Sequence, residues 1–547
     1  MTSISPADTE PPRWTISASV ETLLLGASLF WAVAVNQRFF AGALAGHPGD
    51  NLGFTLALGL ALVALNFLLL APFATRHSVK PLLALMFVAT AFAAHYMNRL
   101  GVYLDPSMLR NVMRTDVREA SELFTPSLVP DLLLLAVLPL VVLWRVRIVR
   151  RAGWATALGV RIAGIGIAAA VLVGTVVAQY QPLASLMRNQ KELRYLITPA
   201  NYVWSLASVF GRDARASGPK KVLGADARPG PSWKTDTRPR VVVFVVGETA
   251  RAANWGLDGY SRQTTPQLAS LPVVAFRDVT SCGTNTEVSV PCMFSALGRR
   301  HYDEDTIRGS ESLLNLLARA GVGVRWRDNQ SGCKGVCDGV PTETAAEVAP
   351  PALCPDGACL DEALLAGLDD WLNKVDGRQI LVLHQLGNHG PAYFRRYPPE
   401  YERFQPACRN EDLRSCTREQ IVNAYDNALL YTDHVLATLV RTLQAHADRV
   451  DATMIYVSDH GESLGENNFY LHGLPYAIAP QEQKKVPMVV WANSGGPLDT
   501  GCLARKAAEP ASHDNLFHLM LGLLDVQTSL YEPEMDPSHG CRREPGA

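Results

Sequence analysis

Two things are scarce in this chain: cysteine, which is missing from the first 281 residues, and net charge. The formal net charge is only −2 over 547 residues. A chain without a strong positive balance has no general attraction to nucleic acid, so we expect no nucleic-acid partner. No internal repeat is present, which argues against a solenoid or propeller.

The 10 cysteines all lie between Cys282 and Cys541. An even number confined to one half of a chain is typical of disulfides in an oxidising compartment. Neighbouring positions favour the pairs 282–292, 333–337, 354–359 and 408–416, with 502–541 remaining. The alternative is a structural zinc site on Cys333 and Cys337, but no second cysteine pair or histidine pair with matching spacing accompanies them.

Charge is nearly absent from five apolar blocks before residue 180. They cover about residues 16–35, 52–73, 81–98, 128–144 and 158–179. Each is close to the ~20 residues that a helix needs to span a hydrocarbon core. Five such blocks in a row are hard to explain as buried helices of a soluble fold. The first lacks a basic leading region and a cleavage site, so it predicts an uncleaved anchor rather than a signal peptide.

Positive charge is concentrated in two of the short loops between these blocks. Arg76 and Lys80 lie between the second and third blocks, and four arginines lie between the fourth and fifth: Arg145, Arg147, Arg150 and Arg151. The positive-inside rule places both loops in the cytoplasm. With five spans, everything after the fifth block then lies on the other side of the membrane.

Composition changes again at the junction of the two halves. Residues 183–210 mix basic and aromatic side chains, which suits a helix in the membrane interface or a plain packing helix. Residues 211–238 are polar and rich in Gly and Pro, as linkers are. We therefore expect a five-helix transmembrane domain at 1–180, an interfacial helix and linker at 181–238, and a soluble domain at 239–547.

The soluble half alternates apolar strands with helical stretches. We expect strands at 240–247, 322–327, 379–384, 452–458 and 486–492, and helices at 310–320, 360–374 and 418–445. Continuous apolar strands separated by helices predict an α/β fold with a mainly parallel sheet covered by helices. Ligands of such folds bind at the carboxyl ends of the strands. The residues at or just after those ends are Glu248, His384, His389, Asp459 and His460.

A nucleophile is suggested by the segment SCGTNTEVSVPCMFS at 281–295, which places Thr286 between two cysteines. Glu248, Asp459 and His460 are suitable zinc ligands, and the Thr286 hydroxyl would complete a tetrahedral site. A threonine hydroxyl is a poor nucleophile at neutral pH, but bound Zn²⁺ lowers the pKa of a coordinated oxygen. These residues predict a zinc-activated nucleophile, although Thr286 alone could be an ordinary loop hydroxyl and Thr284 is a rival.

Five longer segments surround these positions: GETARAANWGLDGY, SCGTNTEVSVPCMFS, DNQSGCKGVCD, GNHGPAYFRRYPPEY and SDHGESLGENNFYLHG. They resemble segments of the lipid A phosphoethanolamine transferases, a family that includes the mobile colistin-resistance enzymes. The similarity spans the whole chain, with the apolar blocks included. It implies an alkaline-phosphatase/sulfatase-like catalytic domain in the periplasm, anchored by five helices in the cell inner membrane.

The resemblance also implies roles for single residues. Glu248, Thr286, Asp459 and His460 correspond to the zinc ligands of the family, and Thr286 rather than Thr284 corresponds to its nucleophile. A disulfide between the flanking cysteines would hold the Thr286 loop rigid. Glu287 has no role in this scheme, since its carboxylate would repel an incoming phosphate unless it faces away or meets an amine.

Substrate contacts follow from the same resemblance. His389 and His472 fall at positions that bind the phosphoryl group or a second zinc ion, and could protonate a leaving alkoxide. Lys334 corresponds to a phosphate or donor contact. Asn111, Thr115 and Glu119 recur every four residues, so on a helix they form one polar stripe. That stripe is either a solvated helix face or, as the resemblance implies, a grip on the ethanolamine lipid.

Together these expectations describe a double displacement. Thr286 takes phosphoethanolamine from phosphatidylethanolamine, and lipid A or a related lipopolysaccharide acceptor then removes it. The product would carry less negative charge and bind cationic peptides such as polymyxin and colistin less tightly. A phosphoglycerol transferase or a phosphodiesterase of the same superfamily is the alternative. A sulfatase would need a CxPxR segment that residues 292–295 lack, and an inactive lipid-binding protein would have lost a site residue.

Overall fold

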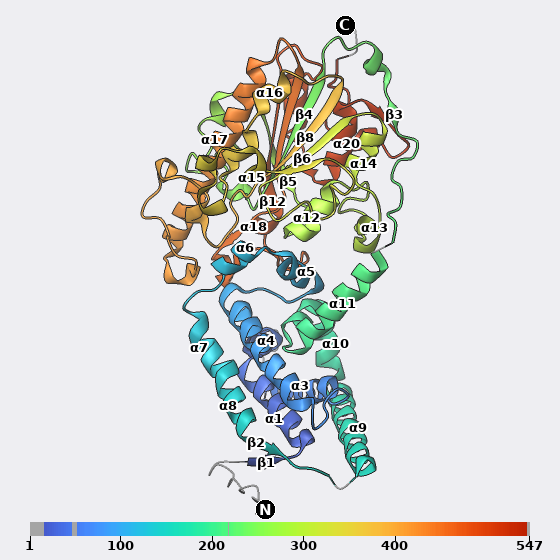
Figure 1. The fold of residues 1–547 in the computed structure, drawn as a ribbon, viewed down its shortest axis with the longest axis vertical. Coiled ribbons are helices and arrows are strands. Elements are labelled where there is room, and N and C mark those ends of the chain that lie inside the picture. The colour runs from blue at the N-terminus through green and yellow to red at the C-terminus, as the bar shows by residue number, and fades with distance from the viewer. Residues whose placement is uncertain (1–15, 46–51, 152, 217, 544–547) are drawn as a thin grey trace, which may run out of the picture. The chain divides into compact units, whose positions relative to one another are not determined.

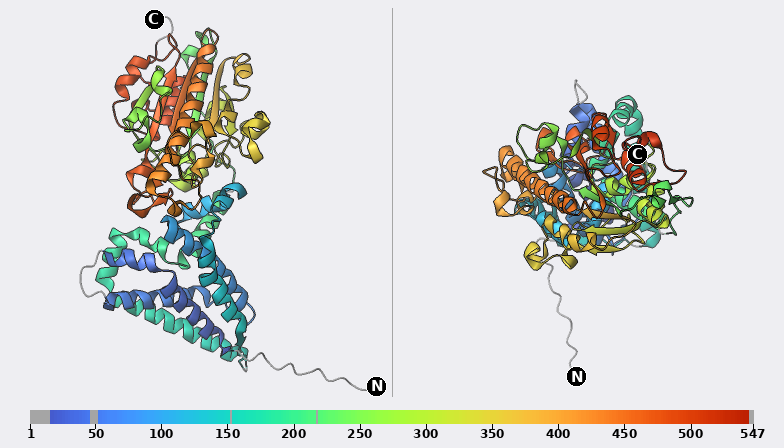
Figure 2. Two further views of the ribbon diagram at one scale, coloured as in Figure 1. Left: turned by 90° about the vertical axis from the view of Figure 1, so that its left-hand side faces the viewer. Right: turned by 90° about the horizontal axis from the view of Figure 1, so that it is seen from above.

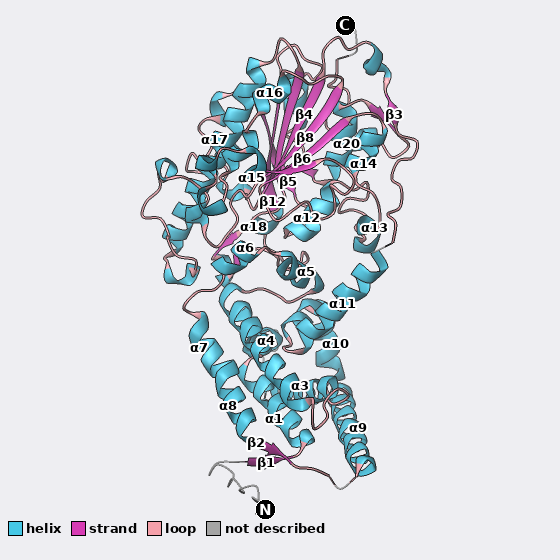
Figure 3. Cartoon of the chain, in the orientation of Figure 1, coloured by secondary structure: helices cyan, strands magenta, loops and turns pink. Residues whose placement is uncertain are grey.

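The structure is a computed structural model, and it describes residues 16–45, 52–151, 153–216 and 218–543 (Figure 1). It divides into two compact units. The helical unit comprises residues 1–106 and 125–207, and the α/β unit comprises residues 107–124 and 208–547. Figure 3 colours the chain by secondary structure, and the long strands in it all belong to the α/β unit.

The helical unit contains the apolar blocks. Its helices are α1 (Val20–Ala34), α2 (Gln37–Ala45), α3 (Leu52–Leu70), α4 (Val79–Leu100), α7 (Leu128–Leu132), α8 (Leu138–Arg145), α9 (Trp154–Ala178), α10 (Tyr180–Asn189) and α11 (Ala200–Ala216), which continues into the other unit. A π-helical turn at Leu133–Val137 joins α7 to α8. Two short parallel strands, β1 (Ile16–Ala18) and β2 (Val146–Ile148), pair at one end.

Four of these stretches are long and apolar enough to cross a membrane, namely α3, α4, the combined α7–α8 helix and α9. A fifth span results if α1 and α2, which are bent by 56° relative to each other, count together. Most of the α9 surface is not buried within the protein, as expected for a helix whose apolar side chains face lipid. The predicted set of membrane helices is therefore confirmed, with the first one shorter and followed by a bend.

The α/β unit is built on one eight-stranded sheet. Its strand order is β13-β5-β12-β9-β4-β8-β6-β7. The central strands β4 (Arg240–Gly247), β9 (Asp451–Ser458), β8 (Arg378–His384) and β6 (Gly323–Asp328) run parallel. Only β12 (Lys485–Ala492) is antiparallel to its neighbours. The mainly parallel sheet predicted from the apolar runs is confirmed, and all eight residues of β4 are buried.

Helices cover both faces of this sheet. Figure 1 shows α16 (Leu368–Leu372) and α17 (Arg418–Ala445) on one side, and α14 (Leu313–Arg319) and α20 (Asp514–Leu523) on the other. The long orange helix in the left view of Figure 2 is α17. The core on the α14 and α20 side also includes residues of α12 (Thr286–Met293) and α19 (Thr500–Lys506).

The remaining elements of the α/β unit are short. They are α5 (Pro106–Arg114), α6 (Val117–Glu122), α13 (Glu304–Arg308), α15 (Ala345–Val348), α18 (Gln481–Lys484), β7 (Thr342–Thr344), β13 (Ala511–Ser512) and two small antiparallel pairs, β10 (Ser463–Leu464) with β11 (Tyr470–Leu471) and β3 (Arg228–Pro229) with β14 (Val526–Gln527). The β3 strand lies in the segment expected to be a linker. The Trp233 ring N–H nearby donates to the Leu524 carbonyl at 3.0 Å, so this part of the segment packs on the α/β unit.

One strand of functional importance was not expected from the sequence. Strand β5 (Val274–Thr280) is antiparallel to β12, which is itself antiparallel to β9. Two reversals restore the direction, so β5 ends at the same edge of the sheet as β4 and β9. The segment that follows β5 and carries Thr286 therefore begins where Glu248 and Asp459 also emerge.

Five disulfides are present among the described residues: Cys282–Cys292, Cys333–Cys337, Cys354–Cys359, Cys408–Cys416 and Cys502–Cys541. These are the pairs favoured by sequence position. All five lie in the α/β unit, and none of the ten cysteines is free. The structural zinc site considered for Cys333 and Cys337 is therefore excluded.

Candidate active site

Thr286 occupies the first position of helix α12. The helix begins there because Asn285 adopts an extended conformation and its side chain accepts the Val288 N–H at 3.0 Å, as an N-cap residue does. The sequence placed Thr286 in a loop, and this expectation is wrong. The Cys282–Cys292 disulfide instead ties the turn after β5 to the last turn of the helix. Thr286 is thereby held at a helix N-terminus, where negative charge is stabilised.

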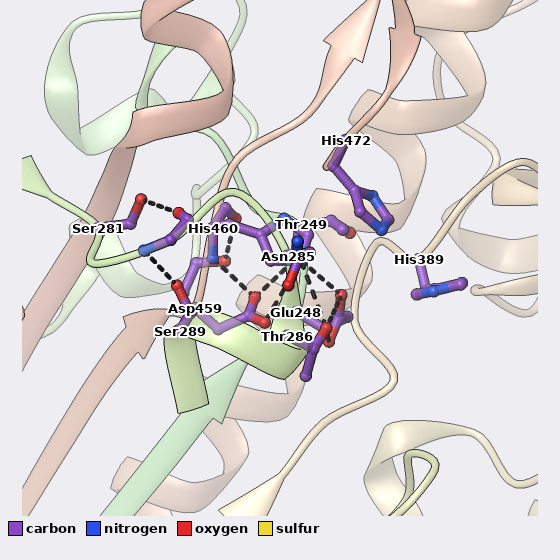
Figure 4. A network of polar contacts seen from close by, with 12 residues as sticks. Glu248, Thr249, Ser281, Asn285, Thr286, Ser289, His389, Asp459, His460 and His472 are labelled. Carbon is purple, nitrogen blue, oxygen red and sulfur yellow. Dashed lines mark hydrogen bonds and ion pairs between the residues drawn. The ribbon is translucent and has the colours of Figure 1, made fainter. Parts of the chain in front are cut away.

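The Thr286 hydroxyl points into a buried group of ligand-type side chains, and Figure 4 shows Glu248, Asp459 and His460 gathered around it. Thr286 Oγ1 donates to Glu248 Oε2 at 3.2 Å and lies 3.4 Å from His460 Nε2. His460 Nε2 is 3.3 Å from Glu248 Oε1 and 3.4 Å from Asp459 Oδ2. We call these four residues the ligand cluster. By contrast, the rival Thr284 hydroxyl donates to the Leu474 carbonyl at 2.6 Å.

The ligand cluster fits a tetrahedral metal ion. With metal–ligand bonds of about 2.0 Å, the corners of a tetrahedron lie about 3.3 Å apart, and the measured separations of 3.2–3.4 Å agree. Asp459 Oδ2 is buried and has no hydrogen-bond partner among the described residues. An acceptor in that state is costly unless something else binds it. The donor set itself therefore favours a bound cation.

Surrounding groups orient the ligands toward the same point. His460 Nδ1 lies 2.9 Å from the Gly461 carbonyl, so that nitrogen carries the proton and Nε2 offers its lone pair to the cluster. Asp459 Oδ1 accepts the backbone N–H groups of His460, at 2.7 Å, and of Thr249, at 3.3 Å, which leaves Oδ2 to face inward. Gln330 Nε2 donates to Glu248 Oε2 at 3.2 Å. Each ligand except Thr286 is thus fixed by a partner outside the cluster.

Electrostatics within the protein lead to the same conclusion. Burial, together with the neighbouring Glu248 carboxylate, raises the pKa of Asp459 to about 7. Burial also disfavours ionised Glu248, but the hydrogen bond and charge of His460 outweigh it and lower the pKa of Glu248 to about 2. For His460, burial lowers the pKa, yet the two carboxylates raise it to about 10. Protons on His460 and Asp459 thus balance the charge of the two buried carboxylates, and a bound divalent cation would take the place of these protons, including the one on His460 Nε2.

Beside the ligand cluster, a row of side chains that includes His472 and His389 extends toward α6. The His472 ring packs on the His460 ring with centroids 4.3 Å apart, and the His389 ring lies 5.6 Å from that of His472. His472 Nδ1 is 3.0 Å from Glu462 Oε2, and His389 Nε2 is 3.6 Å from Glu119 Oε1. Figure 4 shows both histidines on one side of the cluster. The row therefore links the nucleophile to the segment at 107–124.

The two histidines of this row, His389 and His472, are uncharged. Burial and the neighbouring His460 together lower the pKa of His472 to about 3. Burial likewise lowers the pKa of His389, although Glu119 acts in the opposite direction. Glu462, buried beneath His472, has its pKa raised to about 8 by desolvation. Neutral imidazoles suit groups that must accept and return a proton.

The polar stripe expected at Asn111, Thr115 and Glu119 is interrupted, so the prediction that the three share one helix is wrong. Helix α5 ends at Arg114 and α6 begins at Val117. The Thr115 hydroxyl bonds back to the Asn111 carbonyl at 2.7 Å, and Asp116 accepts the Glu119 N–H at 2.9 Å as a cap. Side chains that bond to nearby backbone compete with helix continuation. Among the described contacts of these three residues, that of Glu119 with His389 reaches the row of histidines beside the cluster.

Glu287 faces away from the ligand cluster into a group of cations. Its carboxylate is fully buried, and Oε2 accepts from Arg114 at 3.2 Å and from Arg308 at 3.0 Å. Pro291 has no N–H to donate to the Glu287 carbonyl four residues earlier. Arg308 donates to that carbonyl instead at 2.6 Å. The carboxylate beside the nucleophile is thus neutralised, and it joins α12 to α5 and α13.

Lys334 belongs to this group of cations. Its Nζ lies 3.9 Å from Glu287 Oε1 and donates to the Ser331 hydroxyl at 2.6 Å. Its backbone has a φ of 54°, a left-handed conformation that is uncommon for a lysine. The short Cys333–Cys337 disulfide loop contains it. The structure therefore places the Lys334 ammonium group next to Glu287 and Ser331.

Three residues of the site were not singled out from the sequence. Glu462 and Gln330 support His472 and Glu248, and Thr249 has a φ of 54° with its hydroxyl unpartnered among the described residues. A β-branched residue with positive φ is a strained arrangement of the kind concentrated at functional sites. Glu462 could have been found, since it lies two residues after His460 in the run SDHGES. Nothing in the sequence distinguishes Gln330.

Comparison with known proteins supports the same view of both units. Residues 62–214 match the family model described as Phosphoethanolamine transferase EptA/EptB, and residues 240–526 match the one described as Sulfatase. The chain is 38% identical over 532 residues to Phosphoethanolamine transferase EptA of Escherichia coli K12, covering 95% of this chain and 96% of that protein. It is also 38% identical over 522 residues to Phosphatidylethanolamine transferase Mcr-1 of Escherichia coli, covering 93% and 96%.

A solved full-length structure agrees with these matches. The integral membrane lipooligosaccharide phosphoethanolamine transferase A (EptA) of Neisseria meningitidis superposes with a TM-score of 0.90 at 38% identity, over 96% of this chain and 100% of that one. The chain belongs to the phosphoethanolamine transferase family. The resemblance stated from the five sequence segments is thereby confirmed.

Membership of the phosphoethanolamine transferase family also settles the fold class and the location. The Sulfatase match covers the α/β unit and confirms the predicted sulfatase-like architecture. The match to an integral membrane relative agrees with the apolar helices of the helical unit. A related solved domain is itself described as periplasmic. The chain is therefore a multi-pass inner-membrane protein with its α/β unit in the periplasm, as predicted.

The contacts of Glu287 lead to a prediction about stability. Glu287→Ala is expected to destabilise the protein by roughly 3 kcal/mol, because it removes the carboxylate beside the buried Lys334 and one of the two carboxylates that bind Arg308. The measurement is the apparent melting temperature of the purified full-length protein in detergent. Glu534→Ala, which removes an exposed carboxylate, serves as the control and is expected to change nothing. Equal melting temperatures for the two variants would contradict the assignment.

Proposed function

We propose that this protein transfers phosphoethanolamine from phosphatidylethanolamine to lipid A or a related lipopolysaccharide acceptor. The observation that carries the proposal is the convergence of the Thr286 hydroxyl with Glu248 and His460 within 3.4 Å at the N-terminus of α12. A hydroxyl in that setting is a nucleophile for phosphoryl groups rather than a structural donor. Family membership identifies the group that is transferred.

We further propose that the ligand cluster holds Zn²⁺ through Glu248, Thr286, Asp459 and His460. The donor set, one imidazole and oxygen ligands in a buried site with tetrahedral spacing, is suited to zinc. When bound, the ion would lower the pKa of the Thr286 hydroxyl and offset negative charge on the phosphoryl group. Proton transfer and substrate binding are carried out by side chains of the protein itself.

The first half of the reaction releases diacylglycerol. Thr286 Oγ1 forms a bond to the phosphorus of phosphatidylethanolamine, and the bond from phosphorus to the glycerol oxygen breaks. The proton that the Thr286 hydroxyl gives up must reach the glycerol oxygen as it leaves. We assign this transfer to His389 or His472, neutral imidazoles of the row beside the cluster that can accept a proton and return it. The enzyme then carries phosphoethanolamine esterified to Thr286, on the N-terminal end of α12, where the helix stabilises the remaining negative charge.

The second half returns the enzyme to its starting state. A phosphate or sugar hydroxyl of the acceptor attacks the same phosphorus, the bond to Thr286 Oγ1 breaks, and the threonine oxygen regains the proton that the acceptor hydroxyl gives up. We assign contacts with the donor head group to Glu119, Asn111 and Thr115, with the Glu119 carboxylate paired to the ammonium group, and a phosphate contact to Lys334. The added amine lowers the negative charge of the acceptor, which would weaken its binding of polymyxin and colistin.

The proposal is tested by mass spectrometry of lipid A from cells that express this protein or its Thr286→Ala variant. The expected result is a phosphoethanolamine increment on lipid A with the parent protein only. An increment with both proteins would contradict the assignment of Thr286. If neither protein gives an increment while both are present in the membrane, the acceptor or the head group is a different one. A phosphoglycerol increment would favour the alternative transferase of the same superfamily.

A further inference from the structure

A second site lies in the helical unit, far along the chain from the residues discussed so far. A cavity of about 810 Å³ opens between the start of α1, the loop that joins α3 to α4, and the first turns of α9. Apolar side chains such as Leu158 and Ile162 form one wall, and arginines form the other. Three of its four arginines, Arg76, Arg150 and Arg151, belong to the two loops that the positive-inside rule assigns to the cytoplasm. The cavity therefore lies at the cytoplasmic ends of the spans.

The cavity has a strong excess of positive charge. Four arginines line it, namely Arg76, Arg150, Arg151 and Arg161, against a single carboxylate, Glu21. Both oxygens of the Glu21 carboxylate already accept hydrogen bonds from arginines. Arg151 Nη2 donates to Oε2 at 2.9 Å, and Arg161 Nε donates to Oε1 at 3.2 Å. No carboxylate in the described part of the chain pairs with Arg76 or Arg150. Arg76 Nε donates to His77 Nε2 at 2.7 Å, which a neutral imidazole accepts.

One of these arginines is held rigidly in the cavity wall. Arg161 is 15% exposed, and its Nη1 donates to the carbonyls of Ala71, at 2.7 Å, and of Ala74. Ala71 and Ala74 lie in the turn that follows the end of α3, where backbone carbonyls lack partners within the helix. Arg161 thus fastens α9 to the end of α3 and to Glu21 in α1. The site is consequently built into the helix packing rather than formed by loose surface side chains.

The apolar wall continues outward along α9. Leu158 is 50% exposed and Ile162 is 61% exposed, although both line the cavity. In a membrane-spanning helix such side chains contact acyl chains. A ligand with a phosphate at one end and hydrocarbon at the other would satisfy both walls. Inorganic phosphate or a nucleotide would leave the apolar wall without a partner.

We propose that this cavity binds the head group of an anionic phospholipid of the cytoplasmic leaflet. Its phosphate is paired with Arg76 and Arg150, and its acyl chains lie along Leu158 and Ile162 of α9. Basic pockets between membrane helices on the cytoplasmic side are suited to such head groups. The site is separate from the donor and acceptor contacts of the α/β unit, and the proposal stands whether or not lipid A is the acceptor.

Native mass spectrometry of the purified full-length protein in detergent tests the proposal. The probe is an equimolar mixture of phosphatidylglycerol and phosphatidylethanolamine with the same acyl chains. The parent protein is expected to retain phosphatidylglycerol in preference. An Arg76→Gln/Arg150→Gln variant is expected to lose roughly twentyfold in that affinity, since each arginine near a phosphate contributes about fivefold. The matched control is Arg145→Gln/Arg147→Gln, which removes the same charge from exposed positions in the same loop region outside the cavity.

The control variant is expected to bind as the parent does. Equal binding of the two lipids by the parent, or equal losses in the two double variants, would overturn the proposal. Competition by inorganic phosphate at the concentration of the lipid would show a phosphate site and would also overturn it. If the cavity variant fails to fold, Arg76→Gln and Arg150→Gln are measured separately, and each is expected to lose about fivefold. No loss in either would count against the site.

Discussion

Thr286→Ala is expected to lower the release of diacylglycerol from phosphatidylethanolamine by at least about 10,000-fold, because it removes the only atom that forms a bond to phosphorus. Thr286→Ser keeps the oxygen and is expected to retain measurable activity. The measurement is the turnover of the purified protein with phosphatidylethanolamine in detergent. Melting temperature serves as the check on folding, since Thr286 is buried.

The matched control for Thr286→Ala is Thr284→Ala. Thr284 lies in the same turn and is equally a buried threonine, but its hydroxyl donates to the Leu474 carbonyl instead of facing the ligand cluster. A loss of one hydrogen bond is expected to lower stability by about 1 kcal/mol without abolishing turnover. Comparable losses of turnover in the two variants would show that the chemistry does not depend on the Thr286 hydroxyl.

Glu248→Gln is expected to abolish turnover and to lower zinc affinity by at least about 100-fold. The change keeps the shape of the side chain but removes the negative charge that the cluster offers to a cation, and Glu248 contacts both Thr286 and His460. The measurement is zinc content per chain of the purified protein by elemental analysis, beside turnover after chelation and after addition of Zn²⁺.

Gln330→Ala is expected to lower zinc affinity less than Glu248→Gln does. Gln330 touches Glu248 Oε2 at 3.2 Å from outside the cluster, so its loss is expected to weaken zinc binding by about 10-fold, the lower end for partners that orient a ligand. Addition of Zn²⁺ is expected to restore Gln330→Ala but not Glu248→Gln. Full zinc content and normal turnover in Glu248→Gln would contradict the assignment of the ligand cluster.

Much of the fold could be predicted because its elements have local signatures. The runs RVVVFVVG and ATMIYVS are apolar throughout, and they form β4 and β9, which are buried on both faces as such runs require. The membrane helices could be located from length and lack of charge. The proximity of Glu248, Asp459 and His460 could be predicted because parallel strands present their carboxyl ends at one edge of the sheet.

Other features depend on contacts between distant segments, and local patterns do not reveal them. Strand β5 alternates in burial and lies near the edge of the sheet, between the antiparallel β12 and the two-residue β13, so its sequence carried no clear signal. The break between α5 and α6 results from the side chains of Thr115 and Asp116 bonding to nearby backbone. The i, i+4 spacing of Asn111, Thr115 and Glu119 therefore suggested a continuous helix that does not exist.

The role of Glu287 shows the same limit most clearly. In the sequence it is an acidic residue beside a nucleophile for phosphate, which is unfavourable. In the structure Arg114 and Arg308, from two other elements, bind its carboxylate, and Lys334 lies 3.9 Å away. The separations along the chain, up to 173 residues, leave no trace in local sequence. Its orientation away from the cluster follows from tertiary packing alone.

The central claim is that Thr286 carries phosphoethanolamine between the two substrates. The direct test is to incubate the purified protein with phosphatidylethanolamine in the absence of an acceptor, digest it, and locate the modification by tandem mass spectrometry. Phosphoethanolamine is expected on Thr286 alone, and it is expected to disappear from Thr286 when lipid A is added. Transfer to lipid A without any modified threonine, or modification of a different residue such as Thr284, would contradict it.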